Sequence, residues 1–268
     1  MNPAINAQYL TGSKGALPLE ALYEAGYRGM EALPDCLDPG AGWRTDADRL
    51  GMPIVCVNAM PELRPYLTGS LSDNVLWRRE KTVARLVRTL DQMRALAIPY
   101  LIVAPSRLAE ICQTPDEARA LLTQSLSHLS DAAGEDVVIL LESAPFRLFA
   151  TSTEIAEIID AVARPNVAAA LDIGHALLAG EEPAEAARNL GTRLRYVQLN
   201  DADTAPGAPR LDRHLPLGQG VARAEDVHAV IGDLPYCVNI VAPNDPVGAA
   251  SASLAWLRSR SETSRSAK

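Results

Sequence analysis

The chain has 268 residues, of which 48% are hydrophobic and only 4% are aromatic, and its formal net charge is −8. This length and composition suffice for one large domain with a mainly aliphatic core, which suits parallel strands covered by helices. The acidic balance argues against nucleic acid as a partner, because binding to phosphate groups needs a basic surface.

The N-terminus lacks the pattern of a signal peptide, and no apolar run approaches the roughly 20 residues that a membrane helix needs. The four cysteines are scattered and share no metal-ligand spacing, so we expect reduced thiols. These features predict a cytoplasmic protein with neither a membrane nor a nucleic-acid partner. They leave the oligomeric state open, a homo-oligomer included.

Short apolar runs alternate with segments of helical periodicity along the chain. The expected strands are 5–10, 27–31, 53–58, 99–104, 137–142, 167–172, 194–200 and 237–241. The expected helices are 17–25, 46–50, 74–96, 114–133, 153–162, 183–190, 225–231 and 247–258. Eight strands alternating with helices imply parallel strands with right-handed crossovers, and at this length they predict an α/β fold, a closed (β/α)8 TIM barrel.

We place this single barrel at residues 1–258 and expect residues 259–268 to form a polar, disordered tail. No glycine-rich phosphate loop follows any expected strand, which weakens the alternative of a nucleotide-binding, doubly wound sheet.

In such a barrel the carboxyl ends of the strands face the active site, and here they carry Glu31, Asn58, Glu142, Asp172 and Gln198. Glu142 and Asp172 each follow an apolar run, where burial of an acid costs free energy unless it is paired or binds a cation. Two converging carboxylates repel each other, and a divalent metal would relieve that repulsion and act as a Lewis acid. Oxygen ligands favour Mg²⁺ or Mn²⁺ over zinc.

Simpler roles for these residues stay open at this point. A strand-end acid such as Glu142 or Asp172 can cap the next helix or pair with an arginine. His175, three residues after Asp172 in an expected loop, can be an ordinary residue of that loop. His214 lies in a loop of about twenty residues, 201–220, and loops of that length often carry function.

Several motifs match one known superfamily. Leu171-Asp172-Ile-Gly-His175 resembles the Asp-x-x-His element after the sixth strand of xylose isomerase-like barrels, which include sugar-phosphate isomerases, epimerases and endonuclease-IV-like proteins. Further segments similar to elements of that superfamily are Gly26–Glu31, Leu141–Ser143, Tyr196–Asp201 and His214–Gly220. The resemblance implies the TIM barrel independently of the strand count.

The resemblance also implies a metal site with four ligands, Glu, Asp, His and Glu. Glu142 and Asp172 match the first two, but Gln198 stands third, and we expect Val241 to fill the fourth place, where the family's epimerases have their second acid/base glutamate. Asn239 or Asp245 is the alternative for that place. Some 3-dehydroshikimate dehydratases resemble this arrangement, with a glutamine ligand and the histidine of the sixth strand as base.

We therefore predict a sugar (phosphate) isomerase or epimerase that acts on a small sugar or keto-acid through an enediolate. The alternatives are a dehydratase-like lyase and a catalytically degenerate barrel that binds a sugar-like ligand, while a DNA endonuclease is disfavoured by the acidic charge. The expected cofactor is a divalent metal, Mn²⁺ or Mg²⁺ before Zn²⁺ or Co²⁺. The predicted residues are Glu142, His175 and His214 for catalysis; Glu31, Asn58, Gln198 and Asp201 for substrate binding; and Glu142, Asp172 and Gln198 for the metal.

Overall fold

A computed structural model gives the fold of the chain. It describes residues 2–7, 18–37, 44–59, 70–105, 114–145, 147–203, 211–242 and 244–266, with side chains as far as 260. Part of the first expected strand, residues 8–10, and Cys112 lie outside the described residues. Cys36, Cys56 and Cys237 are free thiols, as expected.

Within the described residues, eight parallel strands pair in sequence order and close into a barrel, which confirms the predicted fold. The strands are Ala4–Asn6 (β1), Gly29–Ala32 (β2), Ile54–Asn58 (β3), Tyr100–Val103 (β4), Val138–Glu142 (β5), Val167–Asp172 (β6), Leu194–Leu199 (β7) and Tyr236–Val238 (β8). Strand β8 pairs with β7 on one side and β1 on the other, so the described sheet has no free edge between its first and last strands.

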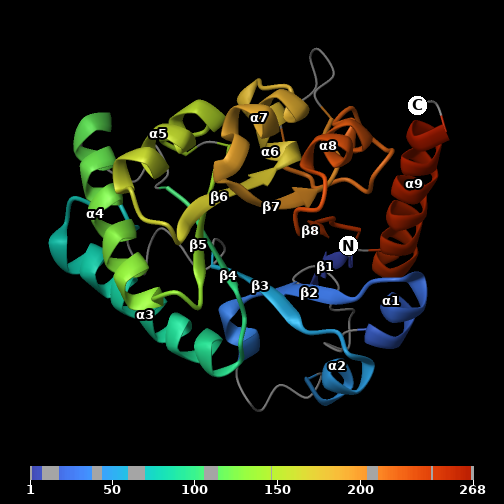
Figure 1. Ribbon diagram of the computed structural model, residues 1–268, viewed down its shortest axis with the longest axis horizontal. Coiled ribbons are helices and arrows are strands. Elements are labelled where there is room, and N and C mark those ends of the chain that lie inside the picture. The colour runs from blue at the N-terminus through green and yellow to red at the C-terminus, as the bar shows by residue number, and fades with distance from the viewer. Residues whose placement is uncertain are drawn as a thin grey trace.

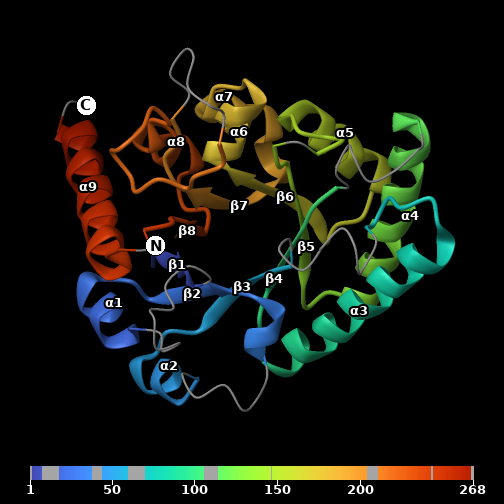
Figure 2. The same ribbon diagram turned by 180° about the vertical axis from the view of Figure 1, so that it is seen from behind.

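Helices cover the outside of the barrel, and α9 lies beside α1, where the ring of helices closes (Figures 1 and 2). The helices are Leu19–Ala25 (α1), Arg44–Leu50 (α2), Leu76–Ala95 (α3), Pro115–Ala133 (α4), Ser152–Val162 (α5), Ile173–Ala179 (α6), Pro183–Leu190 (α7), Ala224–Ile231 (α8) and Pro246–Ser266 (α9). Among the described residues, none of these helices combines the length and the apolar character needed to cross a membrane.

Local signals set the start of several helices. The hydroxyl of Thr114 accepts a hydrogen bond from the backbone N–H of Glu117, 3.2 Å away, at the start of α4. Thr151 and Glu154 form a reciprocal capping box at the start of α5. Such caps satisfy backbone N–H groups that a helix leaves unpaired, so the sequence places these helix starts to within a residue.

Most boundaries differ by one or two residues from those expected, and three differences are larger or affect the site. His175 lies in helix α6 rather than in a loop, because the carboxylate of Asp172 caps the backbone N–H of His175 at 3.0 Å. Strand β8 ends at Val238 instead of residue 241. Helix α9 continues to Ser266, through most of the segment that was expected to be a disordered tail. That segment contains no proline or glycine to interrupt a helix.

Side chains fill the barrel, because every second residue of a strand points inward, and they divide into a lower apolar part and a polar layer above it. The lower layer is apolar or small and consists of Ala4, Cys56, Ile102, Leu140, Ala168, Ala170, Tyr196 and Cys237. The next inward residue toward the carboxyl end of most strands is polar and buried, and these residues are Asn6, Glu31, Asn58, Glu142, Asp172, Gln198 and Asn239. This buried polar layer is the floor of the candidate site.

Candidate active site

Glu31, at the end of β2, is fully buried and surrounded by hydrogen-bond donors. Its Oε1 accepts from the amides of Asn6 at 2.8 Å, Asn58 at 3.0 Å and Gln198 at 2.6 Å. Its Oε2 accepts from the thiol of Cys237 at 3.2 Å. Glu31 and Asn58, whose contact with substrate stays a prediction, are hydrogen-bonded to each other inside the barrel.

Burial raises the pKa of Glu31, and the hydrogen bonds from Asn58, Gln198 and Cys237 only partly oppose that rise. The four donors come from β1, β3, β7 and β8, so this one carboxylate ties together strands on both sides of the barrel seam. A buried carboxylate held in this way contributes to the fold, because each donor would lose its partner if the carboxylate were removed.

Gln198 and Asn239 link Glu31 to Asp172. The amide nitrogen of Gln198 donates to Glu31, while its oxygen Oε1 accepts from Nδ2 of Asn239 at 3.2 Å. The same nitrogen of Asn239 approaches Oδ2 of Asp172 at 3.1 Å. Gln198, predicted as a metal ligand, therefore has both ends of its amide engaged by protein groups.

Asn239, rather than Val241, stands at the end of β8 beside this group. The expectation for Val241 is corrected because β8 ends at Val238, and the backbone N–H of Val241 donates to the carbonyl of His214 at 2.7 Å. Asn239 lies two residues after the inward-facing Cys237 and so shares its face. Asp245, the other alternative, accepts from the backbone of Gly248 at the start of α9.

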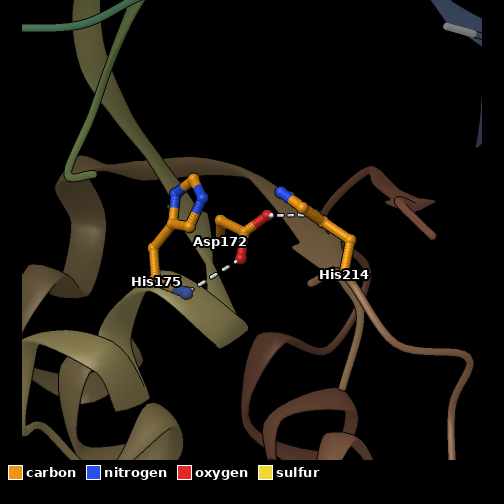
Figure 3. A group of neighbouring side chains, drawn as sticks. All are labelled: Asp172, His175 and His214. Atoms are coloured by element: carbon orange, nitrogen blue, oxygen red, sulfur yellow. Dashed lines mark hydrogen bonds and ion pairs between the residues drawn. The ribbon is translucent and has the colours of Figure 1, made fainter. Parts of the chain in front are cut away.

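Asp172, at the end of β6, is the centre of a second group of polar residues (Figure 3). Nδ2 of Asn200 donates to both of its oxygens, at 2.8 Å and 2.7 Å. Nδ1 of His214 lies 3.7 Å from Oδ2 of Asp172. Gly174 permits this arrangement, because a Cβ atom there would stand 2.3 Å from Oδ1 of Asn200.

The two predicted histidines lie together, with ring centroids 5.3 Å apart and the rings edge to face. Asp212, from the loop after β7, bridges them: its Oδ2 is 3.2 Å from Nε2 of His175, and its Oδ1 is 3.1 Å from Nε2 of His214. His214 has a backbone φ of 44°, in the left-handed region that residues other than glycine seldom adopt. Such strain is typical of positions that the surrounding structure holds for function.

Glu142, at the end of β5, is the least satisfied acid of the polar layer. Its side chain is 1% exposed, and Nδ1 of His175 lies 2.9 Å from its Oε1. The hydrogen bond of good geometry at Nδ1 runs to the carbonyl of Ser143, at 3.2 Å. Neither carboxylate oxygen of Glu142 has a hydrogen-bond partner among the described residues.

Burial and the contacts between acids and histidines set the pKa values in this part of the site. Burial raises the pKa of Glu142 to about 7, against the lowering effect of His175. Burial alone would lower the pKa of both histidines, but Asp172 and Asp212, together with Glu142 at His175, raise them above the usual range. The two histidines in turn hold the pKa of Asp212 well below its usual range, although burial opposes this.

Asp201, whose contact with substrate stays a prediction, holds the loop through its carboxylate. Its Oδ1 accepts from the backbone N–H of Ala202 at 3.1 Å and Ala222 at 2.8 Å, and its Oδ2 accepts from Gly218 at 3.0 Å. Its own backbone pairs with Leu215 in an isolated bridge. This pairing anchors the part of the loop that carries His214.

A divalent metal fits the histidine side of the site. Asp172, His175 and His214 each offer one ligand atom, and these atoms lie within 4.8 Å of one another. Asp212 adds a carboxylate against the Nε2 atoms of both histidines. Imidazole and carboxylate together suit zinc, manganese or cobalt. In the predicted combination of Glu142, Asp172 and Gln198, the amide of Gln198 is hydrogen-bonded at both ends, and this combination stays a prediction.

Sequence reasoning did not single out Asp212 or Asn200. Asp212 could have been suspected from its place two residues before His214 in the long loop. Asn200 follows Gln198 by two residues and therefore shares its inward face. In both residues the signal is weak without the fold, because Asp and Asn are also ordinary residues of loops and turns.

The match to a family model agrees with this geometry. The chain belongs to the xylose isomerase-like TIM barrel family, whose model matches residues 19–260. Two curated proteins called probable endonuclease 4, from strains J and 7448 of Mesomycoplasma hyopneumoniae, are 27% and 26% identical over 166 residues. Each match spans 58% of this chain and 58% of the relative's length.

Solved structures share the fold over nearly the whole chain. A D-tagatose 3-epimerase-like protein has a TM-score of 0.80 at 19% identity, with 98% of this chain and 99% of that chain covered. A 3-keto-D-glucoside 4-epimerase from E. coli has a TM-score of 0.73 at 20% identity, with 97% and 99% covered. A probable 3-DHS dehydratase from Bacillus anthracis has a TM-score of 0.72 at 15% identity, with 96% and 99% covered.

Proposed function

We propose that this protein is an isomerase or epimerase of a small sugar or keto-acid, and that Glu142 moves the proton. The observation that carries this proposal is the state of Glu142, which is buried, has no hydrogen bond of good geometry among the described residues and has only His175, 2.9 Å away, as an ion-pair partner. A buried acid that the fold leaves unsatisfied is a frequent feature of catalytic sites. Shared folds with sugar epimerases support the same reaction class.

The pKa of Glu142, about 7, suits it to proton transfer near neutral pH, where both protonation states are populated. Its carboxylate would take a proton from a carbon next to a carbonyl group, and the electron pair of that C–H bond would form the enediolate. Return of the proton to the neighbouring carbon gives an isomer. Return to the opposite face of the same carbon gives an epimer and requires a second proton donor.

His175 would stabilise the negative oxygen that forms in this step. Its raised pKa favours the imidazolium form, and Asp212 at Nε2 and the carbonyl of Ser143 at Nδ1 orient the ring beside Glu142. His214, held by the carboxylate of Asp212, would be the second cation beside the substrate. If a divalent metal is bound, Asp172, His175 and His214 would hold it with Asp212 alongside, both imidazoles would be neutral, and the metal would take the place of the imidazolium in polarising the carbonyl oxygen.

Hydrogen exchange in D₂O tests the proposal. The protein, purified without chelator and supplied with Mn²⁺ or Zn²⁺, is incubated with D-tagatose, D-fructose, D-allulose and 3-dehydroshikimate, and NMR follows deuterium at the carbon next to the carbonyl. We expect exchange with one of these, and a loss of about 10²–10⁴-fold in Glu142→Gln. Glu157→Gln, a change of an exposed acid on α5, is the matched control and should keep the wild-type rate. Equal rates in both variants would contradict the role of Glu142.

A dehydratase-like lyase is the second candidate, and the position of Gln198 on β7 favours it, because the dehydratases that the sequence resembles carry a glutamine at that place. The fold shared with a probable 3-DHS dehydratase supports it as well. In that reaction His175 would abstract the proton, and the enolate would expel water. Loss of water from 3-dehydroshikimate, seen by NMR in the same incubation, would favour the lyase over the isomerase.

We further propose that nucleic acid is not the substrate, although the curated relatives are called probable endonuclease 4. The formal net charge of −8 is unfavourable for contacts with a phosphate backbone. Incubation with a duplex that contains an abasic site, in the presence of Zn²⁺ or Mn²⁺, should leave the duplex intact. Cleavage that disappears in Glu142→Gln would contradict this part of the proposal.

A further inference from the structure

The hydrogen bonds of Glu31 fix the orientation of the Gln198 amide and, through it, that of the Asn239 amide. An ionised carboxylate only accepts hydrogen bonds, so Gln198 must turn its nitrogen toward Glu31, at 2.6 Å. The oxygen of the Gln198 amide then points to Nδ2 of Asn239, at 3.2 Å. The orientation of Gln198 thus follows from the position of Glu31 on the far side of the barrel seam.

Asn239 is fixed in the same way from two sides. Its nitrogen faces two acceptors, Oε1 of Gln198 and Oδ2 of Asp172, at 3.2 Å and 3.1 Å. Its oxygen Oδ1 is buried and has no hydrogen-bond partner among the described residues. A buried acceptor without a donor costs about 1–3 kcal/mol, so an amide free to turn would not keep this orientation.

We propose that Glu31 is a positioning residue: through Gln198 it holds the amide of Asn239 with Oδ1 unpaired, and that oxygen accepts a hydrogen bond from a hydroxyl group of the ligand. The assignment of a hydroxyl rests on the proposed function, because a sugar or hydroxy-acid presents such donors. The positioning by Glu31 stands on the hydrogen bonds alone. A neutral amide oxygen suits a neutral donor, and it stands at the end of β8, where the family's epimerases carry a carboxylate.

Side-chain amide NMR tests the positioning in the full-length chain without any ligand. The signals of Gln198 and Asn239 are assigned by their loss in Gln198→Met and Asn239→Asp. We expect the amide protons of Asn239 to exchange with D₂O at least about 10-fold faster in Glu31→Met and in Gln198→Met. The first variant removes the acceptor of the Gln198 amide, and the second removes the acceptor of the Asn239 amide. Glu31→Gln should restore slow exchange, because its Oε1 can still accept from Gln198.

Asn6→Ala is the matched control, because Asn6 also donates to Oε1 of Glu31 but does not lie between Glu31 and Asn239. We expect Asn6→Ala to leave the exchange of the Asn239 amide as in the wild type. An unchanged exchange rate in Glu31→Met overturns the positioning role, and so does equal acceleration by Asn6→Ala. If Glu31→Met does not fold, Glu31→Ser takes its place by the same criterion, because it also lacks the carboxylate that accepts from Gln198.

A titration with D-tagatose, D-fructose or D-allulose tests the hydroxyl. One of them should shift the Asn239 amide signal and bind at least about 10-fold more weakly to Gln198→Met than to Asn6→Ala. Zn²⁺ alone is titrated first, because a metal on Asp172 shifts the neighbouring Asn239 signal as well. If none of the sugars adds a shift to that of the metal, the hydroxyl assignment is overturned, while the exchange experiment still decides the positioning. A ligand that shifts the signal but shows no hydrogen exchange sensitive to Glu142 contradicts the proposed function and leaves this inference standing.

Discussion

Glu31 and Glu142 are the same residue type in the same buried layer, yet their surroundings are opposite. Their side chains are 0% and 1% exposed, and burial raises the pKa of both. Glu31 accepts hydrogen bonds from three amides and a thiol, whereas neither oxygen of Glu142 has a hydrogen-bond partner among the described residues. The difference lies in their donors and not in their burial.

This comparison separates two uses of a buried acid. Donors that satisfy Glu31 make it part of the framework, because the framework loses hydrogen bonds if the acid is removed. Glu142 contributes no such bonds, and the fold tolerates it at a cost in desolvation. Proteins retain such costly groups where chemistry needs them, which is why we assign the reaction to Glu142 and the framework to Glu31.

The largest expected effect on stability comes from removing the carboxylates. Glu31→Met should lower the free energy of unfolding by at least about 3 kcal/mol, because three buried amide donors lose their acceptor. Glu142→Met should stay within about 1 kcal/mol of the wild type, because the lost contact with His175 is offset by the removed cost of burying an acid. Urea unfolding midpoints measure both. Equal losses in the two variants would remove the distinction.

The pH dependence of stability should reveal the titration of the Glu142 carboxyl group. A folded-state pKa raised to about 7 means that its contribution is fully present below its unfolded pKa and is lost as the pH rises through about 7. The expected loss is on the order of 2–3 kcal/mol between pH 5 and 8. Urea unfolding across this range, with a chelator present, should show a weaker decline in Glu142→Gln. An identical decline in both proteins would assign the titration to other groups, such as Glu31.

Metal binding should depend on the histidine side of the site and not on Gln198. At a metal concentration 100 times the dissociation constant, stabilisation of about 2.7 kcal/mol raises the melting temperature by several degrees. We expect thermal unfolding to show this shift with Zn²⁺ or Mn²⁺ in the wild type and in Gln198→Met, but not in His214→Gln. Loss of the shift in Gln198→Met alone would restore the ligand set expected from the sequence.

The smallest expected effect on stability concerns Asp201, an acid outside the buried polar layer. Asp201→Asn replaces one acceptor oxygen with an NH₂ group, so the amide cannot satisfy Gly218, Ala202 and Ala222 together. We expect a loss of about 1 kcal/mol in stability by urea unfolding. Faster proteolysis within residues 201–220 should accompany it. A stable loop with altered ligand affinity would instead support the predicted contact with substrate.

Alternating patterns in the sequence were enough to predict the barrel. Strand β6 and helix α7 have the predicted bounds, because an apolar run ends at Asp172 and because Pro183 and Gly191 flank the helix. Helix α6 was missed, since it is only seven residues long, contains Gly174 and starts directly at the end of a strand. Its capping signal, Asp172 three residues before His175, was in the sequence but could equally mark a metal ligand.

The sequence by itself determined that Glu31, Glu142, Asp172 and Gln198 stand at inward-facing positions near the carboxyl ends of strands in a parallel barrel, because that follows from local periodicity. Only the tertiary structure decided which of these acids is satisfied. The donors to Glu31 lie 25 to 206 positions away along the chain, and Asp212 reaches both histidines from a loop. Hydrogen bonds at that separation depend on how the strands are placed in three dimensions, which local patterns do not encode.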